Sequence, residues 1–188
     1  MTNNTLPTGN SIEHDIWQQL LRASVDKHHE WRCPILATKE DGYGLDARVI
    51  ILRAVDVDEK KLTFYTDSRS PKVSQLLGNP DVVLVFWSKR LNWQLRVKAT
   101  MEVTTEGSLV DKIWAIVKQS PTAKDYCSAL IPGQMQQHLP LEVDKQSLEK
   151  PNFALLTARV ISIDWLALNR SGHQRATINS HGIVHTAP

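Results

Sequence analysis

DARVIILRAVDVDEKKLTFYTDSRSPKVSQLL, residues 46–77, decides the fold of this chain. Its many β-branched residues predict a strand over Ala47–Val55, a turn over Asp56–Lys60 and a second strand over Lys61–Thr66. Side chains alternate between the two faces of a strand. One face of the first strand therefore carries Arg48, Ile50 and Leu52, and the other carries Val49, Ile51 and Arg53. Arg48 lies at the end of an apolar face, where a guanidinium needs an anionic partner.

The end of this stretch predicts a helix with a polar start. Ser70 is a suitable N-cap, Pro71 favours the first helical position, and Gly78 with the following Asn79-Pro80 marks the end. Cations and hydroxyls gather here, namely Arg48, Arg69, Lys72, Thr66 and Ser70. A helix N-terminus with such groups nearby can bind a phosphate. An ordinary N-cap with solvated cations is the alternative, and Arg69 and Lys72 alone favour it.

Composition indicates a globular protein of 188 residues, with 41% hydrophobic and 22% charged residues and a net charge of +2. This charge demands neither nucleic acid nor an anionic membrane, and no apolar run is long enough to span a bilayer. We expect a mobile N-terminus over residues 1–10 and a single domain over 11–188. The polar start does not resemble a signal peptide, and the isolated Cys33 and Cys127 favour the cytoplasm.

Most of the other elements are also predicted to be strands. They are expected over Cys33–Thr38, Val82–Trp87, Trp93–Thr105, Ala154–Leu166, Gln174–Ile178 and Ile183–His185. The continuous apolar run Val82–Trp87 predicts burial on both faces, whereas Trp93–Thr105 alternates and has one polar face. Helices are expected over Ser11–Lys27 and Glu106–Gln119, a turn and short helix from Ser120–Asp125, and a loop over His138–Pro151. Many strands with short connections favour an antiparallel barrel with peripheral helices.

The order of these motifs resembles the pyridoxamine 5′-phosphate oxidase-like, FMN-binding split-barrel flavoproteins. The matching motifs are Arg48-Val49-Ile50-Ile51-Leu52-Arg53, Tyr65-Thr66, Arg69-Ser70-Pro71-Lys72 and Gln94-Leu95-Arg96. The resemblance implies a mainly β, Greek-key-like split barrel that binds FMN at the interface of a homodimer. It is stronger to the shorter relatives of the oxidase than to the oxidase itself.

The resemblance also implies a set of FMN-binding residues. They are Arg48, Val49, Ile50, Ile51, Tyr65, Thr66, Arg69, Ser70, Lys72, Gln94, Gln134, Trp165 and Arg175. Taken alone, Trp165 would more simply be a core residue and Arg175 a surface charge. The oxidase has an arginine immediately before its lysine, where this chain has Pro71, and Arg69 is the candidate replacement for that charge.

The substrate side departs further from the oxidase. His173 matches a substrate histidine, and Arg53 and Arg170 are the nearest counterparts of two substrate cations. Where the oxidase has Tyr, Arg and Ser for its substrate's phosphate, an ungapped alignment back from Gln134 gives Val117, Pro121 and Asp125. We therefore expect an intact flavin site beside an altered substrate site.

The expected function is an FMN-dependent oxidoreductase that acts on a small molecule, and no catalytic acid, base or metal site is identified. A flavin carries the redox chemistry itself, so the lack of an acid–base motif does not count against an enzyme. Three alternatives stay open: a flavin-binding module without turnover, a genuine pyridoxine/pyridoxamine 5′-phosphate oxidase, and a barrel that holds another cofactor such as haem or a deazaflavin.

Overall fold

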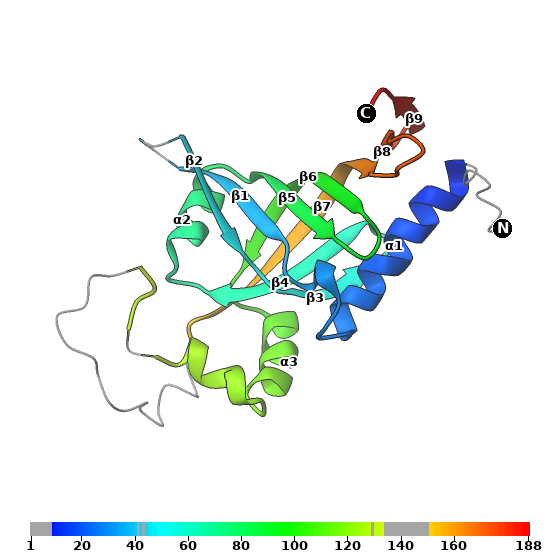
Figure 1. The fold of residues 1–188 in the computed structure, drawn as a ribbon. Coiled ribbons are helices and arrows are strands. Elements are labelled where there is room, and N and C mark those ends of the chain that lie inside the picture. Colours follow the sequence, from blue (N-terminus) through cyan, green and yellow to red (C-terminus); the bar gives the residue numbers. More distant parts are fainter. Residues whose placement is uncertain (1–8, 41, 43, 129, 134–150) are drawn as a thin grey trace.

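A computed structural model describes residues 9–40, 42, 44–128, 130–133 and 151–188, and all structural statements below concern these residues. An antiparallel sheet of nine strands forms the body of the protein (Figure 1). The strands are β1 (Ile35–Glu40), β2 (Gly44–Val49), β3 (Leu52–Asp56), β4 (Lys61–Asp67), β5 (Asp81–Ser88), β6 (Trp93–Thr104), β7 (Phe153–Ala167), β8 (Gln174–Asn179) and β9 (Gly182–Thr186). The helices are α1 (Gly9–Val25), α2 (Pro71–Gly78) and α3 (Ser108–Val117), with 3₁₀ turns η1 (Glu30–Arg32) and η2 (Pro121–Tyr126). The predicted antiparallel, mainly β architecture is confirmed.

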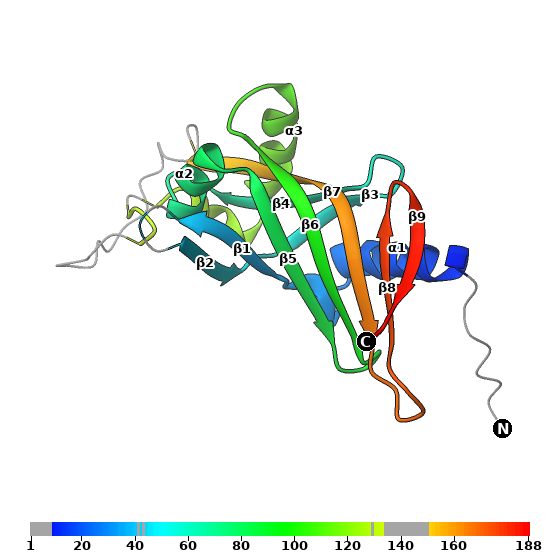
Figure 2. The same cartoon turned by 90° about the horizontal axis from the view of Figure 1, so that it is seen from above.

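The long strand β7 divides the sheet. The main order is β2-β1-β5-β6-β7-β4-β3, and β8 also pairs with β7. One edge of β7 pairs with β6 along its length, whereas the other edge pairs first with β4 and then with β8. The change of partner falls near Ile161, where the register with β6 also shifts by a bulge. In Figure 2, α2 lies toward one end of the sheet and β8 and β9 lie toward the other.

Two groups of buried apolar side chains hold the fold together. The larger lies inside the barrel and is closed by α1, whose Ile12, Ile16 and Leu20 are buried. The smaller lies under α3 and η2, where Trp114 and Phe153 stack at 5.3 Å between ring centroids. Because both groups reach β4, the two faces of this strand are both covered near its C-terminal end.

The predicted strand Ala47–Val55 is two strands. β2 pairs with β1, and β3 pairs with β4, so the chain changes partners at Ile50–Ile51. The backbone N–H of Ile50 donates to the carbonyl of Pro34 at 3.0 Å, in the register of β1 and β2, and Leu52 then pairs with Phe64 of β4. The predicted alternation nevertheless holds across the break, because Ile50 and Leu52 are buried and Val49 and Ile51 are exposed.

Three further expectations differ from the structure. β5 alternates in burial and leaves Trp87 45% exposed, so it is not covered on both faces within one chain. The sequence predicts an apolar face for the helix over Glu106–Gln119, made of Leu109, Ile113, Trp114, Ile116 and Val117. In α3, however, Leu109 and Ile116 are exposed, because only the Val110, Trp114 and Val117 side meets the smaller core. α1 begins at Gly9, two residues before the expected boundary at Ser11, and residues 1–8 lie outside the described range.

In the described part of the chain, we find no helix that is both long and apolar enough to cross a membrane. The predicted loop His138–Pro151 and the candidate residue Gln134 fall outside the described residues, apart from Pro151 itself.

Candidate functional site

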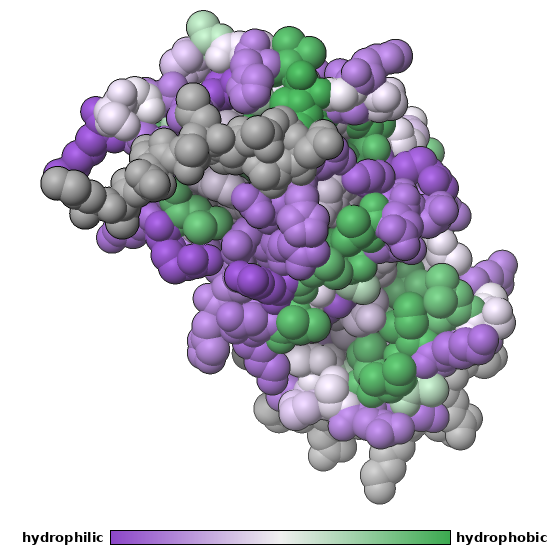
Figure 3. All heavy atoms as spheres, turned by 90° about the vertical axis from the view of Figure 1, so that its right-hand side faces the viewer, coloured by the Kyte–Doolittle hydropathy of each residue, from purple (hydrophilic) through white to green (hydrophobic). Residues whose placement is uncertain are grey.

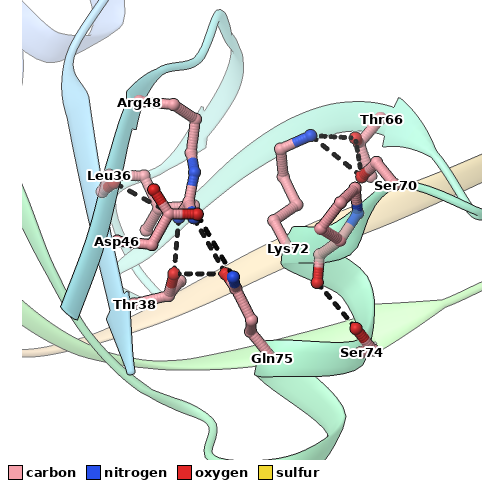
Figure 4. Close-up of polar contacts among 10 residues, drawn as sticks. Leu36, Thr38, Asp46, Arg48, Thr66, Ser70, Lys72, Ser74 and Gln75 are labelled. Atoms are coloured by element: carbon pink, nitrogen blue, oxygen red, sulfur yellow. Dashed lines mark hydrogen bonds and ion pairs between the residues drawn. The ribbon is translucent and has the colours of Figure 1, made fainter. Parts of the chain in front are cut away.

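Thr66, Ser70 and Lys72 meet where β4 passes into α2 (Figure 4). The ammonium Nζ of Lys72 donates to Ser70 Oγ at 2.9 Å and to Thr66 Oγ1 at 3.1 Å. The two hydroxyl oxygens lie 3.3 Å apart. The chain turns between β4 and α2 within three residues, which brings the last inward side chain of the strand against the first turn of the helix. These three residues are called the Lys72 cluster below.

The Lys72 cluster has the properties of an anion site. Ser70 occupies the N-cap position as predicted, but its side chain makes no capping hydrogen bond. Lys72 forms no ion pair with any described carboxylate. Burial, and then the nearby charge of Arg48, lower the pKa of the Lys72 ammonium, whereas Asp67 and Asp46 act in the opposite direction. A half-buried cation at a positive helix end is relieved by a bound anion.

Arg48 lies beside this cluster and already has an internal anionic partner, Asp46 on the same face of β2. Its guanidinium also donates to Thr38 Oγ1 at 2.5 Å and to Gln75 Oε1 at 2.8 Å. The amide of Gln75 donates to Asp46 at 3.2 Å, and this bond is the main cause that lowers the pKa of Asp46. Asp46 is therefore the anionic partner that Arg48 was expected to need.

Within the described structure, Arg69 forms hydrogen bonds outside the Lys72 cluster. Its guanidinium bonds Asp67 through Nη2 at 2.7 Å and through Nε at 3.1 Å. Nη2 also donates to the carbonyls of Ser128 and Leu130, at 2.8 and 3.0 Å. Arg69 thus fastens the segment after η2 to the turn before α2, and its charge is matched by Asp67. We call this set of bonds the Arg69 clamp.

The same segment comes close to the first residue of α2. Gly133 has a φ of +82°, and a Cβ atom at this position would lie 3.2 Å from the ring of Pro71. A larger residue would be strained by the backbone angle and crowded by the proline. The Arg69 clamp and Gly133 together hold this segment near the Lys72 cluster.

A second group of predicted site residues lies on β6, β7 and β8. Gln94 and Arg175 stand on either side of Leu166 in register, so their side chains share one face of the sheet. Arg175 Nη2 bonds Asp164 at 2.7 Å, and Asp164 also pairs with Arg96. The bond from Arg175 is the main cause that lowers the pKa of Asp164.

Trp165 is in the barrel core. Its side chain is 1% exposed, and its ring meets that of Trp93 edge-on at 5.3 Å between centroids. Its Nε1 has no hydrogen-bond partner in the described structure. The side chain therefore occupies the position of a core residue in this chain.

Within one chain, the Lys72 cluster and the predicted site residues on β6, β7 and β8 lie far apart. Thr66 pairs with Ala154 on β7, whereas Arg175 pairs with Leu166, and these β7 residues are 166 − 154 = 12 positions apart. At about 3.3 Å per residue, that separation is roughly 40 Å along an extended strand. The predicted site residues therefore form two half-sites, one at α2 and one at the start of β8.

The remaining candidates fall in three places. Tyr65 faces the smaller core, and the guanidinium of Arg53 lies 5.4 Å from the centre of its ring. His173 is exposed in the turn before β8, where its Nδ1 accepts a hydrogen bond from the Asn169 backbone at 3.3 Å. Arg170 is exposed in the same turn. Arg53 lines a cavity, together with Val117 and Pro121.

Several residues of the half-site at α2 were absent from the sequence prediction. Asp46 and Gln75 surround Arg48, and each had a local signal. Asp46 precedes Arg48 by two positions on a strand, and Gln75 follows Lys72 by three positions on a helix, so each pair shares a face. Thr38 comes from another strand, and no local pattern indicates it.

Residues 14–105 match the sequence family described as "Pyridoxamine 5′-phosphate oxidase, FMN-binding domain". The chain is 29% identical over 96 residues to the pyridoxine/pyridoxamine 5′-phosphate oxidase of Burkholderia thailandensis, which covers 50% of this chain and 42% of that protein. It is 36% identical over 61 residues to the enzyme of the same name from Caulobacter vibrioides, which covers 32% and 27%. The chain thus spans less than half the length of these relatives.

Solved structures extend the likeness to the whole fold. A pyridoxamine 5′-phosphate oxidase-related, FMN-binding protein from Nostoc punctiforme aligns over 100% of both chains, with a TM-score of 0.67 and 19% identity. PhzG from Burkholderia lata, solved with tetrahydrophenazine-1-carboxylic acid, aligns over 98% of both chains, with a TM-score of 0.70 and 18% identity. The predicted FMN-binding split barrel is confirmed, and FMN is the cofactor of the matching family domain.

Proposed function

We propose, from the premise that residues 14–105 belong to the pyridoxamine 5′-phosphate oxidase family of FMN-binding domains, that this protein is an FMN-dependent oxidoreductase. We further propose that it acts on a small molecule through a substrate site that differs from that of the oxidase. The isolated cysteines support a cytoplasmic location.

We infer how FMN is bound from the distance between the two half-sites. The Lys72 cluster adjoins Ala154 of β7 through Thr66, whereas Arg175 pairs with Leu166 of β7. Within one chain, the two half-sites are therefore too far apart to contact one FMN molecule. A second copy of the chain would bring the Gln94 and Arg175 half-site of one subunit to the Lys72 half-site of the other. We propose a homodimer with two equivalent FMN sites at its interface.

Exposed apolar side chains support this assembly. Val49 is 62% exposed, Trp87 45% and Ile161 55%, although all three are on strands or at strand ends of the barrel. On the face drawn in Figure 3, apolar side chains also form several patches between hydrophilic ones. Association would remove such surface from water, which is the main favourable term in obligate dimers.

Each group of residues has a proposed task. The Lys72 cluster fits the FMN phosphate, because it offers an unpaired ammonium and two hydroxyls at a helix start. Arg48, held by Asp46 and Gln75, adds positive potential beside it. The exposed Val49 and Ile51 supply an apolar edge for the ring. Bound FMN would supply the capacity to accept a hydride from the substrate.

Two other functions are distinguishable from this proposal. A flavin-binding module without turnover would hold FMN that no amine, alcohol or nicotinamide donor reduces. The relatives' names favour an oxidase of pyridoxine and pyridoxamine 5′-phosphate, which the altered substrate side argues against. The absorbance spectrum of the purified protein tests the cofactor, and anaerobic titration with each donor tests for reduction.

Lys72→Ala is expected to weaken FMN binding by about tenfold or more, because a charge-assisted phosphate contact contributes about 1.5–3 kcal/mol. FMN should likewise bind the unchanged protein more tightly than riboflavin, which has no phosphate. Fluorescence titration with both flavins measures the two effects. Lys112→Gln is the matched control, since Lys112 is an exposed cation on α3 outside this site. Equal affinities for FMN and riboflavin would contradict the phosphate assignment.

The pH profile separates the charge of Lys72 from its packing. Its pKa lies below the usual lysine value, and phosphate binding favours the ammonium. FMN affinity should therefore be constant between the second pKa of the FMN phosphate, about 6, and the pKa of Lys72, and should fall as pH rises through the latter, earlier than for an ordinary lysine. Lys72→Arg stays protonated and should abolish this fall. The same falling profile in Lys72→Arg would assign the titration to another group.

Subunits with complementary defects test the shared site. Lys72→Ala and Arg175→Met chains are each expected to bind FMN weakly, whereas their co-expressed heterodimer should contain one intact site and bind FMN tightly. Differently tagged chains allow purification of the heterodimer, and light scattering gives its mass. A monomer that holds FMN at full occupancy, or a heterodimer no better than its parents, would refute the interface site.

A further inference from the structure

Asp164 on β7 lies between two arginines on the face of the sheet that points away from the barrel core. Figure 2 shows β7 beside β6 and β8, which carry Arg96 and Arg175. Asp164 is the register partner of Arg96, so the two side chains leave the sheet on the same face. Arg175 pairs with Leu166, two positions along β7, and reaches the same carboxylate along a diagonal. Arg96, Asp164 and Arg175 are called the Asp164 triad below.

The carboxylate of Asp164 fixes the orientation of the Arg175 guanidinium. Arg175 Nε donates to Asp164 Oδ1 at 2.9 Å, and Nη2 donates to Oδ2 at 2.7 Å. Two parallel bonds of this kind restrict the rotation of the guanidinium. Its other N–H groups have no acceptor among the described residues, so they are available to a ligand in a fixed direction.

Positive charge exceeds negative charge in the Asp164 triad. Two guanidinium groups face one carboxylate, and within the described structure neither arginine pairs with another carboxylate. The bond from Arg175, reinforced by Arg96 and opposed by burial, lowers the pKa of Asp164, so its carboxylate is ionised at neutral pH. Asp164 therefore offsets one of the two positive charges and leaves the other.

This charge balance affects the hydride transfer that the proposed function requires. A hydride consists of one proton and two electrons, so its transfer from a substrate to a flavin adds one negative charge to the flavin ring. Nearby positive charge favours the reduced ring, and nearby negative charge favours the oxidised ring. In the proposed homodimer, Arg175 belongs to the half-site that completes an FMN site, so the Asp164 triad acts on this ring.

We propose that Asp164 is a positioning residue, which holds Arg175 toward bound FMN and lowers the midpoint potential of the flavin. Its carboxylate fixes the free donor groups of Arg175 and offsets charge that would otherwise favour the reduced ring. The bound flavin is therefore a stronger reductant than it would be beside the two arginines alone. Because Arg175 meets FMN in the proposed homodimer, this role of Asp164 rests on the proposed function.

The midpoint potential of bound FMN, measured without oxygen against reference dyes, tests this role in the FMN-loaded protein. Asp164→Asn removes the charge but keeps an amide oxygen that can accept a bond from Arg175. Affinity for reduced FMN relative to oxidised FMN should rise about tenfold, which raises a two-electron potential by about 30 mV. Asp164→Glu keeps the charge and should shift the potential much less. Asp111→Asn is the matched control and should leave the potential unchanged, since Asp111 is exposed on α3, at the other end of β7.

Arg96→Gln supplies a second test with the opposite sign. It removes one positive charge while both bonds between Arg175 and Asp164 remain, so the potential should fall by about 30 mV. Combining Arg96→Gln with Asp164→Asn restores the net charge of the Asp164 triad, and the potential should return close to that of the unchanged protein. Such compensation identifies an effect of charge, because two independent structural defects would add.

The potentials and the flavin content together separate this role of Asp164 from the proposed function. Bound FMN with one potential in all variants, or with shifts of the same sign in Asp164→Asn and Arg96→Gln, would overturn the role and leave the proposed function intact. If Asp164→Asn loses FMN altogether, the Arg96→Gln protein decides: a lower potential supports the role, and an unchanged one overturns it. An unchanged protein that binds no FMN would refute the proposed function and this role together.

Discussion

Oxidation of pyridoxine or pyridoxamine 5′-phosphate is expected to proceed with a kcat/KM well below about 10⁴ M⁻¹s⁻¹ in the FMN-loaded protein. The ungapped alignment back from Gln134 gives Val117, Pro121 and Asp125 where the resemblance implies Tyr, Arg and Ser for the substrate's phosphate. Val117 and Pro121 line the cavity that Arg53 also lines, and they donate no side-chain hydrogen bond. Loss of one arginine–phosphate contact already costs about 1.5–3 kcal/mol.

Steady-state turnover checks this expectation, with pyridoxal 5′-phosphate and peroxide as the two products followed. The flavin content of each sample is measured by absorbance, so that low turnover is not mistaken for low occupancy. Arg53 remains as a cation beside Val117 and Pro121, so weak binding of phosphate esters without efficient turnover is compatible with this expectation. A kcat/KM at or above about 10⁴ M⁻¹s⁻¹ would instead assign the oxidase activity to this protein.

Asp67→Ala is expected to lower the free energy of unfolding by about 3–5 kcal/mol, the range for removing one partner of a buried ion pair. Asp67 is 7% exposed and receives three hydrogen bonds from Arg69, two from the guanidinium and one from the backbone at 2.8 Å. Without this carboxylate, the Arg69 clamp loses its only described anionic partner. Urea denaturation followed by tryptophan fluorescence measures the change.

The same substitution should also weaken FMN binding, because the Arg69 clamp holds Ser128 and Leu130 beside the start of α2. Asp81→Ala is the matched control, since Asp81 is an exposed carboxylate at the start of β5. The control should change stability by no more than about 0.5 kcal/mol. A change below about 1 kcal/mol for Asp67→Ala would show that the ion pair is not a principal support of this region.

Local spacing in the sequence determined the elements around the half-site at α2. The hairpin leading into a Ser70-Pro71 helix start is present, and the Lys72 cluster lies where the sequence placed it. Alternation along Trp93–Thr104 also predicted the buried face of β6 correctly. These features depend on residues close in the chain, whose relative positions follow from the periods of strand and helix.

Long-range pairing decided what the sequence by itself left open. The break at Ile50–Ile51 arises because β2 and β3 pair with different strands, although the residues themselves favour one continuous strand. The sequence left Arg69 as either part of a phosphate site or a solvated cation, and it did not indicate Asp67 as its partner. In the folded chain, the carboxylate of Asp67 is buried beside the guanidinium of Arg69 and pairs with it.

Tertiary structure also divided the predicted FMN site and assembled the cavity that Arg53 lines. The sequence order of Lys72 and Arg175 contains no measure of their distance, which follows from the 12 positions of β7 that separate the pairing partners of Thr66 and Arg175. Lys27, Arg32 and Arg53 come from three separate parts of the chain and converge because α1 and η1 pack against β3. Motifs within one element were therefore predictable, whereas sites built between elements required the folded chain.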